Sequence, residues 1–239
     1  MVPRPDFFIV GAPKSATSAL VSYLAAHPEI HIAEGETHYF ATDFGGLRIV
    51  TNLACYQNLL NSHKRGVRCL GEKSVCYMYS SQAIEMIHRY NPEARLIVML
   101  RNPSDMVFSF HGQSLYAQSE NEPDFAKAWA LCAARKAGMK VSRLCKAREL
   151  LFYDEIARYG EQIERILALF PRELVHIIFY DDFIANPSLV YRKTLSFLRV
   201  APQNRKDFPV VNSRKAVRSK LIQSSLLWAS HFTYRTRME

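Results

Sequence analysis

Cysteine is scarce and irregularly placed in this chain of 239 residues. There are five cysteines, an odd number, and no two of them form a CxxC pair. Disulfide frameworks and structural zinc sites both rely on closely spaced, paired ligands, which this pattern does not offer. We therefore expect buried free thiols and no metal site.

Long apolar runs and linker-like segments are also missing. No stretch approaches the ~20 apolar residues of a membrane-spanning helix, and the apolar run after Asp6 is cut short by GAPKS, unlike a secretory signal. With 49% hydrophobic and 22% charged residues, but only 9 Gly and 11 Pro, the composition is that of a globular protein. We expect one cytoplasmic domain over residues 1–239 with no membrane partner.

The most informative stretch lies near the N-terminus, DFFIVGAPKSATSALVSYLAAH. Residues 7–10 read as a short buried strand, Gly11 and Pro13 break it, and helical spacing begins near Thr17. In such a strand, loop and helix, the free N–H groups of the first helical turn converge on one point and favour an anion. Lys14 adds a positive charge there, so the loop predicts an anion-binding site.

The loop does not match the Walker A pattern, because Lys14 precedes the hydroxyl residues instead of following a second glycine. The strand RLIVML also ends in Arg101, where a magnesium-binding Asp would be expected in a nucleoside triphosphatase. Both departures disfavour a metal-dependent triphosphatase.

Further strands and helices alternate along the chain, which favours a mostly parallel sheet flanked by helices, an α/β fold. Ligands of such sheets collect at the carboxyl ends of the strands, which brings residues 11–18, Glu36, Lys73 and Arg101 into one crevice. Strands are expected at 7–10, 67–70, 95–100 and 174–180, with a short segment at 30–33. Helices are expected from about 17 to 27 and at 81–90, 103–117, 123–137, 159–170 and 187–198, while 42–65 reads as an uneven loop.

Four motifs, GAPKSATSAL, EGETHYF, GEKSVCY and RNPSDMVFS, resemble those of sulfotransferases that use 3′-phosphoadenosine 5′-phosphosulfate (PAPS). They occur in the family's order, and they are closest to the heparan sulfate and bacterial members. The resemblance covers residues 7–198 and implies a P-loop-like architecture, with PAPS as sulfuryl donor, adenosine 3′,5′-bisphosphate (PAP) as product, and no metal.

The resemblance also implies roles for individual residues. Glu36 is the expected base, Lys14 meets the leaving nucleotide, and Lys73 lines the active site, with His38 beside Glu36. The residues expected to bind the nucleotide are Lys14, Ser15, Ala16, Thr17, Ser18, Arg101, Ser109, Arg214 and Lys215.

The chain departs from the family pattern at several positions. Ala16 replaces the usual Gly of the loop, so that either the loop tolerates a methyl group or the anion is displaced. Gly35 replaces a Lys that is frequent in bacterial relatives. The late basic loop is not well defined, and Arg214 and Lys215 are taken as its substitute. Val75 and Cys76 stand where phenol-type enzymes carry a catalytic His, which argues against that subfamily.

The acceptor is less clearly indicated. Aromatic side chains suit sugar rings and flat phenols alike, and Tyr77 and Tyr116 are the aromatic residues expected to contact the acceptor, although such residues can equally be core. We expect a hydroxyl of a saccharide or small metabolite, with an amine as second choice. The acceptor's identity and the oligomeric state cannot be read from the chain.

Two alternatives come from different functional classes. The loop could serve a P-loop-like nucleotide or small-molecule kinase. The basic segment 199–239, with nine Lys or Arg against two acidic residues in a chain of net charge +9, could bind nucleic acid. No nucleic-acid-binding motif occurs, so the sequence favours a sulfotransferase without a nucleic-acid partner.

Overall fold

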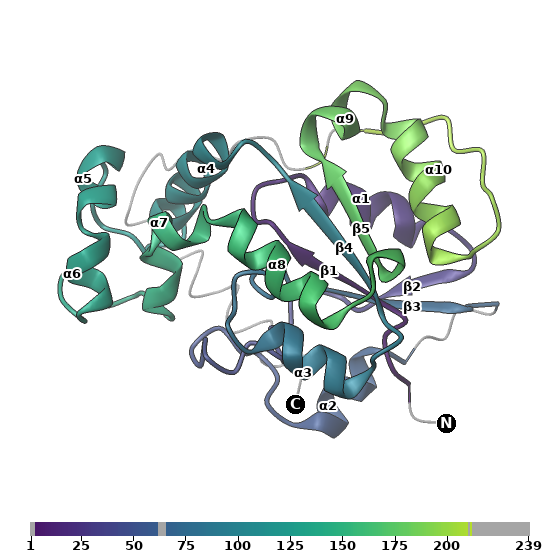
Figure 1. Ribbon diagram of the computed structural model, residues 1–239, viewed down its shortest axis with the longest axis horizontal. Coiled ribbons are helices and arrows are strands. Elements are labelled where there is room, and N and C mark those ends of the chain that lie inside the picture. The colour runs from purple at the N-terminus through teal and green to yellow at the C-terminus, as the bar shows by residue number, and fades with distance from the viewer. Residues whose placement is uncertain (1–2, 62–65, 210, 212–239) are drawn as a thin grey trace.

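The centre of the computed structural model, which describes residues 3–61, 66–209 and 211, is a five-stranded sheet (Figure 1). The strand order is β2-β3-β1-β4-β5, and every pairing is parallel. The strands are β1 (Phe7–Gly11), β2 (Ile30–Ile32), β3 (Cys69–Lys73), β4 (Arg95–Leu100) and β5 (Val175–Phe179). The predicted α/β fold with a parallel sheet is confirmed.

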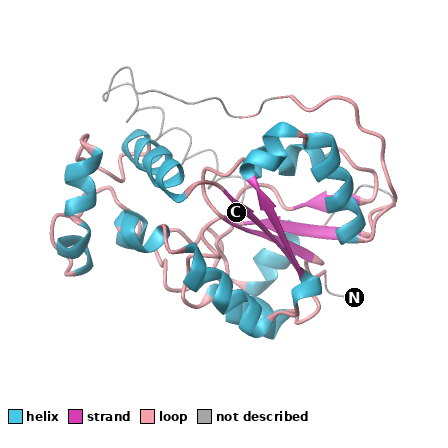
Figure 2. Cartoon of the chain, turned by 45° about the horizontal axis from the view of Figure 1, so that its top comes forward, coloured by secondary structure: helices cyan, strands magenta, loops and turns pink. Residues whose placement is uncertain are grey.

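Strand β1 is buried on both faces, which is why its sequence is continuously apolar. Phe8 and Val10 face one core, covered by α2 (Leu53–Leu59), α3 (Ala83–Tyr90) and α8 (Tyr159–Leu169). Phe7 and Ile9 face the other core, covered by α1 (Thr17–Ala25), α9 (Tyr180–Ala185) and α10 (Pro187–Leu198). The result is a three-layer arrangement, seen from two directions in Figures 1 and 2.

A helical lobe extends from one side of the sheet (Figure 1). It has its own small core, in which Met106, Phe110 and Tyr153 are buried. The lobe contains α4 (Pro103–Tyr116), α5 (Phe125–Ala130), α6 (Cys132–Lys136), the 3-10 helix η1 (Arg148–Leu151) and α7 (Tyr153–Ile156), and a second 3-10 helix, η2 (Arg172–Leu174), precedes β5.

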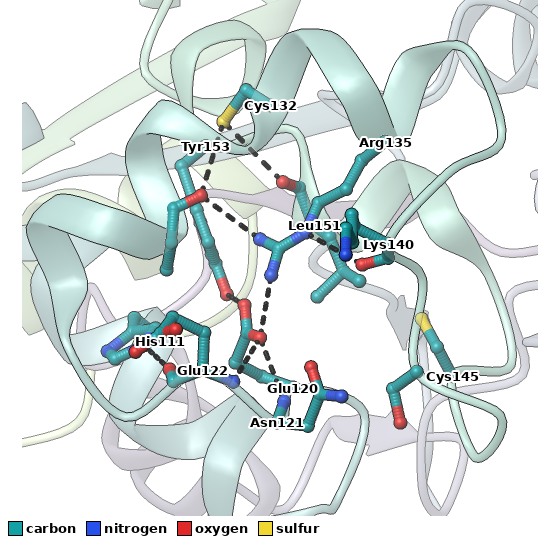
Figure 3. A network of polar contacts seen from close by, with 12 residues as sticks. His111, Glu120, Asn121, Glu122, Cys132, Arg135, Lys140, Cys145, Leu151 and Tyr153 are labelled. Carbon is teal, nitrogen blue, oxygen red and sulfur yellow. Dashed lines mark hydrogen bonds and ion pairs between the residues drawn. The ribbon is translucent and has the colours of Figure 1, made fainter.

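A buried ion pair organises this lobe (Figure 3). Arg135 Nη2 lies 2.7 Å from Glu120 Oε1, and neither side chain is exposed. Tyr153 donates its hydroxyl to the other oxygen of Glu120 (2.8 Å), and the N–H groups of Asn121 and Glu122 donate to Oε1. The carboxylate therefore connects the loop after α4 to α6 and α7.

Element boundaries follow the sequence closely where the pattern is apolar. Strand β4 and helix α10 lie where they were predicted, at 95–100 and 187–198. Strand β3 was predicted at 67–70 but runs from Cys69 to Lys73, because the buried Glu72 conceals a core strand behind a polar residue. The helix predicted at 123–137 is two short helices, interrupted at Leu131.

Helix α2 was missed, since it lies in the region read as an uneven loop. It is short and buries only Tyr56, so its apolar pattern is weak. The Asn52 side chain accepts the N–H groups of Ala54 and Cys55 and so caps its first turn.

All five cysteines are free, as expected, but only three are buried, and Cys55 is exposed. Within residues 3–61, 66–209 and 211, none of the helices has the length and apolar character required to span a membrane. Arg214 and Lys215 lie outside the described residues, as does most of the basic segment 199–239.

Candidate functional site

The loop between β1 and α1 has the backbone shape of an anion site. Lys14 and Ala16 have left-handed backbones, with φ of 57° and 65°, and the Ala12 N–H donates to the Met99 carbonyl of β4 (2.7 Å). A Cβ at Gly11 would lie 2.9 Å from the Val75 carbonyl, so that only glycine fits there. Helix α1 has no acidic residue in its first turn, which leaves its positive dipole end uncompensated.

Side chains of the loop are set at different depths. Ser15 is fully buried and donates its hydroxyl to the Pro13 carbonyl (3.2 Å), and Thr17 is buried. Lys14 and Ser18 are half-buried. Ala16 is half-buried in its left-handed conformation and packs against the core beneath α1. The loop therefore accommodates the methyl group that replaces the family's usual glycine.

The predicted catalytic residues meet beside the end of β3. Lys73 Nζ lies 2.6 Å from Glu36 Oε1, and His38 Nε2 lies 3.6 Å from Glu36 Oε2. The Val75 N–H also donates to Glu36 Oε2 (3.2 Å). Glu36 keeps 27% of its side chain exposed, so that this tethered carboxylate remains accessible from solvent.

His38 is held neutral at this site. Burial lowers the pKa of His38 below its usual 6.5, against the opposing effect of Glu36 and with the help of Lys73. Its Nδ1 atom is buried and has no hydrogen-bond partner among the described residues. The imidazole is therefore uncharged near pH 7 and offers a neutral nitrogen.

A second cationic group lies at the end of β4. Arg101 follows the strand, with its guanidinium 4.7 Å from the centroid of the Tyr180 ring and 3.8 Å from Asp105. The Arg101 Nε atom is buried and unpartnered within the described chain. Ser109 is half-buried two turns along α4. Because β1, β3 and β4 are adjacent and parallel, the loop, Lys73 and Arg101 share one edge of the sheet.

Tyr159, the first residue of α8, was not singled out in the sequence. Burial raises the pKa of Tyr159 to about 12, while the neighbouring Ser15 side chain and Arg101 backbone oppose the rise. Its hydroxyl oxygen is buried and completes no hydrogen bond with the described residues. Tyr159 thus lies between the two predicted nucleotide-binding groups, and no sequence pattern marks it because it reads as the start of an amphipathic helix.

The two aromatic residues expected to contact an acceptor are placed differently. Tyr77 is fully buried, and its hydroxyl donates to Glu72 (3.0 Å). It presents no surface to an acceptor, so the structure corrects that expectation and places Tyr77 in the core. Tyr116 is half-buried at the end of α4.

Among the described residues there is no group of three or more His, Cys, Asp or Glu that could hold a metal ion.

Comparison with protein families agrees with these motifs. The family described as "Sulfotransferase domain" matches residues 4–224, which is most of the chain. The chain belongs to the sulfotransferase family. The resemblance inferred from the four motifs is thereby confirmed.

Curated relatives of this sulfotransferase include heparan sulfate glucosamine 3-O-sulfotransferase 6 of mouse and of human. Each is 28% identical over 196 residues, which are 81% of this chain and 52% of the relative. The bifunctional heparan sulfate N-deacetylase/N-sulfotransferase of Drosophila melanogaster is 23% identical over 83% of this chain and 20% of its own. The sulfotransferase therefore spans about half the length of the 3-O-sulfotransferases that it matches.

The solved structures that resemble this chain include other sulfotransferases. A sulfotransferase from Alicyclobacillus acidocaldarius aligns with a TM-score of 0.75 and 28% identity, covering 99% of this chain and 94% of that one. The sulfotransferase domain of the curacin biosynthetic pathway has the same fold, with a TM-score of 0.52 and 16% identity over 85% of this chain and 76% of that one.

Proposed function

We propose that this protein transfers the sulfuryl group of PAPS to a hydroxyl of a saccharide or small metabolite. The observation that carries the proposal is the contact of Glu36 with Lys73 and His38 at the sheet edge shared with the β1–α1 loop and Arg101. One edge of the sheet thus offers a candidate base for the acceptor and two cationic groups for the two anionic groups of the nucleotide, its 5′-phosphosulfate and its 3′-phosphate.

The nucleotide fits the chemistry of the residues present. The N–H groups at the start of α1 and Lys14 suit the 5′-phosphosulfate. Arg101 suits the 3′-phosphate, because a guanidinium can bind two phosphate oxygens at once, and its buried Nε lacks a partner in the described chain. Ser109 would add a hydroxyl donor, and Arg214 and Lys215 remain proposed contacts.

Each catalytic residue then has a defined task. Glu36 accepts the proton of the acceptor hydroxyl while the oxygen of that hydroxyl forms its bond to sulfur. Lys14 compensates the negative charge that grows on the bridging oxygen of the departing PAP, whose bond to sulfur breaks. Lys73 orients Glu36 through their contact, and its ammonium group is also the proposed partner of the sulfuryl oxygens. Neutral His38 lies beside the other oxygen of the Glu36 carboxylate. Catalysis of this kind depends on positioning and electrostatic stabilisation.

The acceptor class rests on the relatives. The mouse and human proteins are named for 3-O transfer on heparan sulfate glucosamine, which supports a saccharide hydroxyl. Tyr116 remains a proposed acceptor contact.

The experiment that tests the proposal combines binding with transfer. Calorimetric titration with PAP should show binding, with ATP and Mg²⁺ as the comparison, and bound PAP should raise the melting temperature. Transfer of labelled sulfate from PAPS is then measured with N-sulfated heparosan oligosaccharides and with small alcohols. Binding of ATP and Mg²⁺ without binding of PAP would overturn the proposal in favour of a kinase.

Removing the Arg101 side chain should weaken PAP binding. Charge-assisted hydrogen bonds contribute about 1.5–3 kcal/mol each, so we expect Arg101→Ala to raise the Kd for PAP by about 10- to 100-fold in calorimetry. Arg89→Ala is the matched control, since Arg89 is an exposed arginine of α3 that pairs with Glu85. Equal affinities of the two variants would exclude Arg101 from the nucleotide site.

Removing the Tyr159 hydroxyl should weaken PAP binding without lowering stability. A single hydrogen bond contributes about 0.5–1.5 kcal/mol, so Tyr159→Phe should raise the Kd for PAP by about 3- to 10-fold. Deleting a buried oxygen that has no partner should leave the free energy of unfolding equal or higher. Tyr79→Phe is the control, because the Tyr79 hydroxyl donates to the Glu149 carbonyl (2.8 Å); it should lose stability and keep its affinity. The reverse pattern would contradict the assignment of Tyr159.

A further inference from the structure

A buried carboxyl group lies directly beneath the proposed catalytic cluster. Glu72 precedes Lys73 on β3 and is fully buried. Among the residues that the structure describes, its hydrogen-bond partners are four neutral hydroxyl groups and no cation: Thr37 (2.9 Å), Ser74 (2.6 Å), Tyr77 (3.0 Å) and Tyr56 (3.1 Å). An unpaired buried carboxyl group is costly, and nothing in the proposed reaction uses it directly.

Three of these hydroxyl groups also accept backbone N–H groups from one short segment. The His38 N–H donates to Ser74 (3.0 Å), the Tyr39 N–H to Thr37 (3.2 Å) and the Phe40 N–H to Tyr77 (3.3 Å). A backbone N–H group can only donate. The three hydroxyl oxygens therefore serve as acceptors for the segment, and each hydroxyl lies within donating distance of Glu72.

The geometry of these bonds to Glu72 suits a side chain with an acceptor oxygen at both of its terminal positions. Its two oxygens accept from all four hydroxyl groups, which a carboxylate can do and a side-chain amide cannot. Burial raises the pKa of Glu72, and the hydrogen bonds from the four hydroxyl groups oppose that rise. The four hydroxyl groups thus partly offset the cost of burying this carboxyl group.

The segment held in this way carries the catalytic side chains. Glu36 and His38 flank Thr37, and His38 has a left-handed backbone with φ of 49°, an uncommon conformation that its surroundings must maintain. Glu36 contacts Lys73, which follows Glu72 in the strand. One carboxyl group therefore lies on the strand that carries Lys73 and is connected, through hydroxyl groups, to the segment that follows Glu36.

We propose that Glu72 is a positioning residue for sulfuryl transfer, acting through the hydroxyl groups of Thr37, Ser74 and Tyr77 to hold Glu36 and His38 against Lys73. The proposal rests on the proposed function of that cluster. Glu72 itself touches neither donor nor acceptor.

The test replaces Glu72 with glutamine. The N–H₂ group of glutamine is a donor and cannot accept a hydrogen bond from the hydroxyl groups that face it. We expect turnover with N-sulfated heparosan and PAPS to fall by about 10- to 100-fold, as displaced catalytic groups do, while the Kd for PAP stays within about twofold. The His38 imidazole, assigned with His38→Gln, is followed by ¹H–¹⁵N NMR. If residues 38–40 loosen, the His38 imidazole becomes less buried, and its pKa should move upward toward 6.5. The charged side chains that face it are Glu36 and Lys73.

Two further variants keep the test decisive if Glu72→Gln does not fold. Ser74→Ala breaks the link between Glu72 and the His38 amide, and should also raise the His38 pKa. Tyr56→Phe removes a hydroxyl that donates to Glu72 and, among the described residues, to none of residues 38–40. It keeps the ring that packs against Tyr39 and Phe40, and should leave the His38 titration unchanged. Equal titrations in Ser74→Ala and wild type would overturn the proposal. The NMR measurement needs no nucleotide, so a wild type that fails to bind PAP would refute the proposed function separately.

Discussion

Glutamine in place of Glu36 is expected to lower the rate of sulfate transfer by about 100- to 10,000-fold, the usual contribution of a positioned acid or base. The amide cannot accept the proton of the acceptor hydroxyl, although its oxygen can still meet Lys73. Because the proposed role of Glu36 is at the acceptor and not at the nucleotide, the Kd for PAP should stay within about twofold. Single-turnover transfer of labelled sulfate and calorimetry with PAP measure the two quantities.

Glu34→Gln provides the control for this experiment. Glu34 is an exposed carboxylate two positions away and should be replaceable without loss of turnover. Full activity of Glu36→Gln would remove Glu36 as the base. A parallel loss of PAP affinity would instead indicate that Glu36 helps to form the nucleotide site.

The largest effect on stability is expected from Glu120→Gln. The change leaves the guanidinium of Arg135, which is fully buried, without its counter-charge. Breaking a buried ion pair by removing one partner typically costs about 3–5 kcal/mol. We expect the free energy of unfolding in urea to fall by about that amount.

A double variant separates the ion pair from simple packing. Glu120→Gln combined with Arg135→Met removes the uncompensated charge and should recover part of the loss. Arg89→Met, which breaks the exposed pair with Glu85 on α3, should change stability by less than about 0.5 kcal/mol. If the double variant were less stable than Glu120→Gln alone, the buried charge would not be the cause.

The elements that the sequence predicts best are those whose burial can be read from apolar residues alone. The run RLIVML gives β4 because all its central residues are buried. Arg101 could be placed because it follows this strand directly, and Lys14 because it lies three residues after the end of β1. The bounds of strand β3 could not be predicted in this way, because the strand contains the buried polar residue Glu72. Its burial depends on hydroxyl donors from positions 37, 56, 74 and 77. Such a network exists only once the chain has folded.

The same limit applies to single aromatic residues. Composition cannot distinguish a tyrosine that lines a site from one that fills the core, and Tyr77 proved to be the second kind. Tyr159 is the converse case, since its position between Ser15 and Arg101 comes from the packing of α8. Both outcomes depend on tertiary contacts between distant segments.

The central position of β1 also affects how the chain can fold during synthesis. Of the five strands it is synthesised first, yet its neighbours are β3 and β4, so that Phe7 must pair with Gly71 and Arg95. Pairings so distant in sequence slow folding and leave apolar strands unpaired in the meantime. A nascent chain that stops before Arg95 would present FFIV without its second partner strand, β4, and a chaperone could bind this apolar segment.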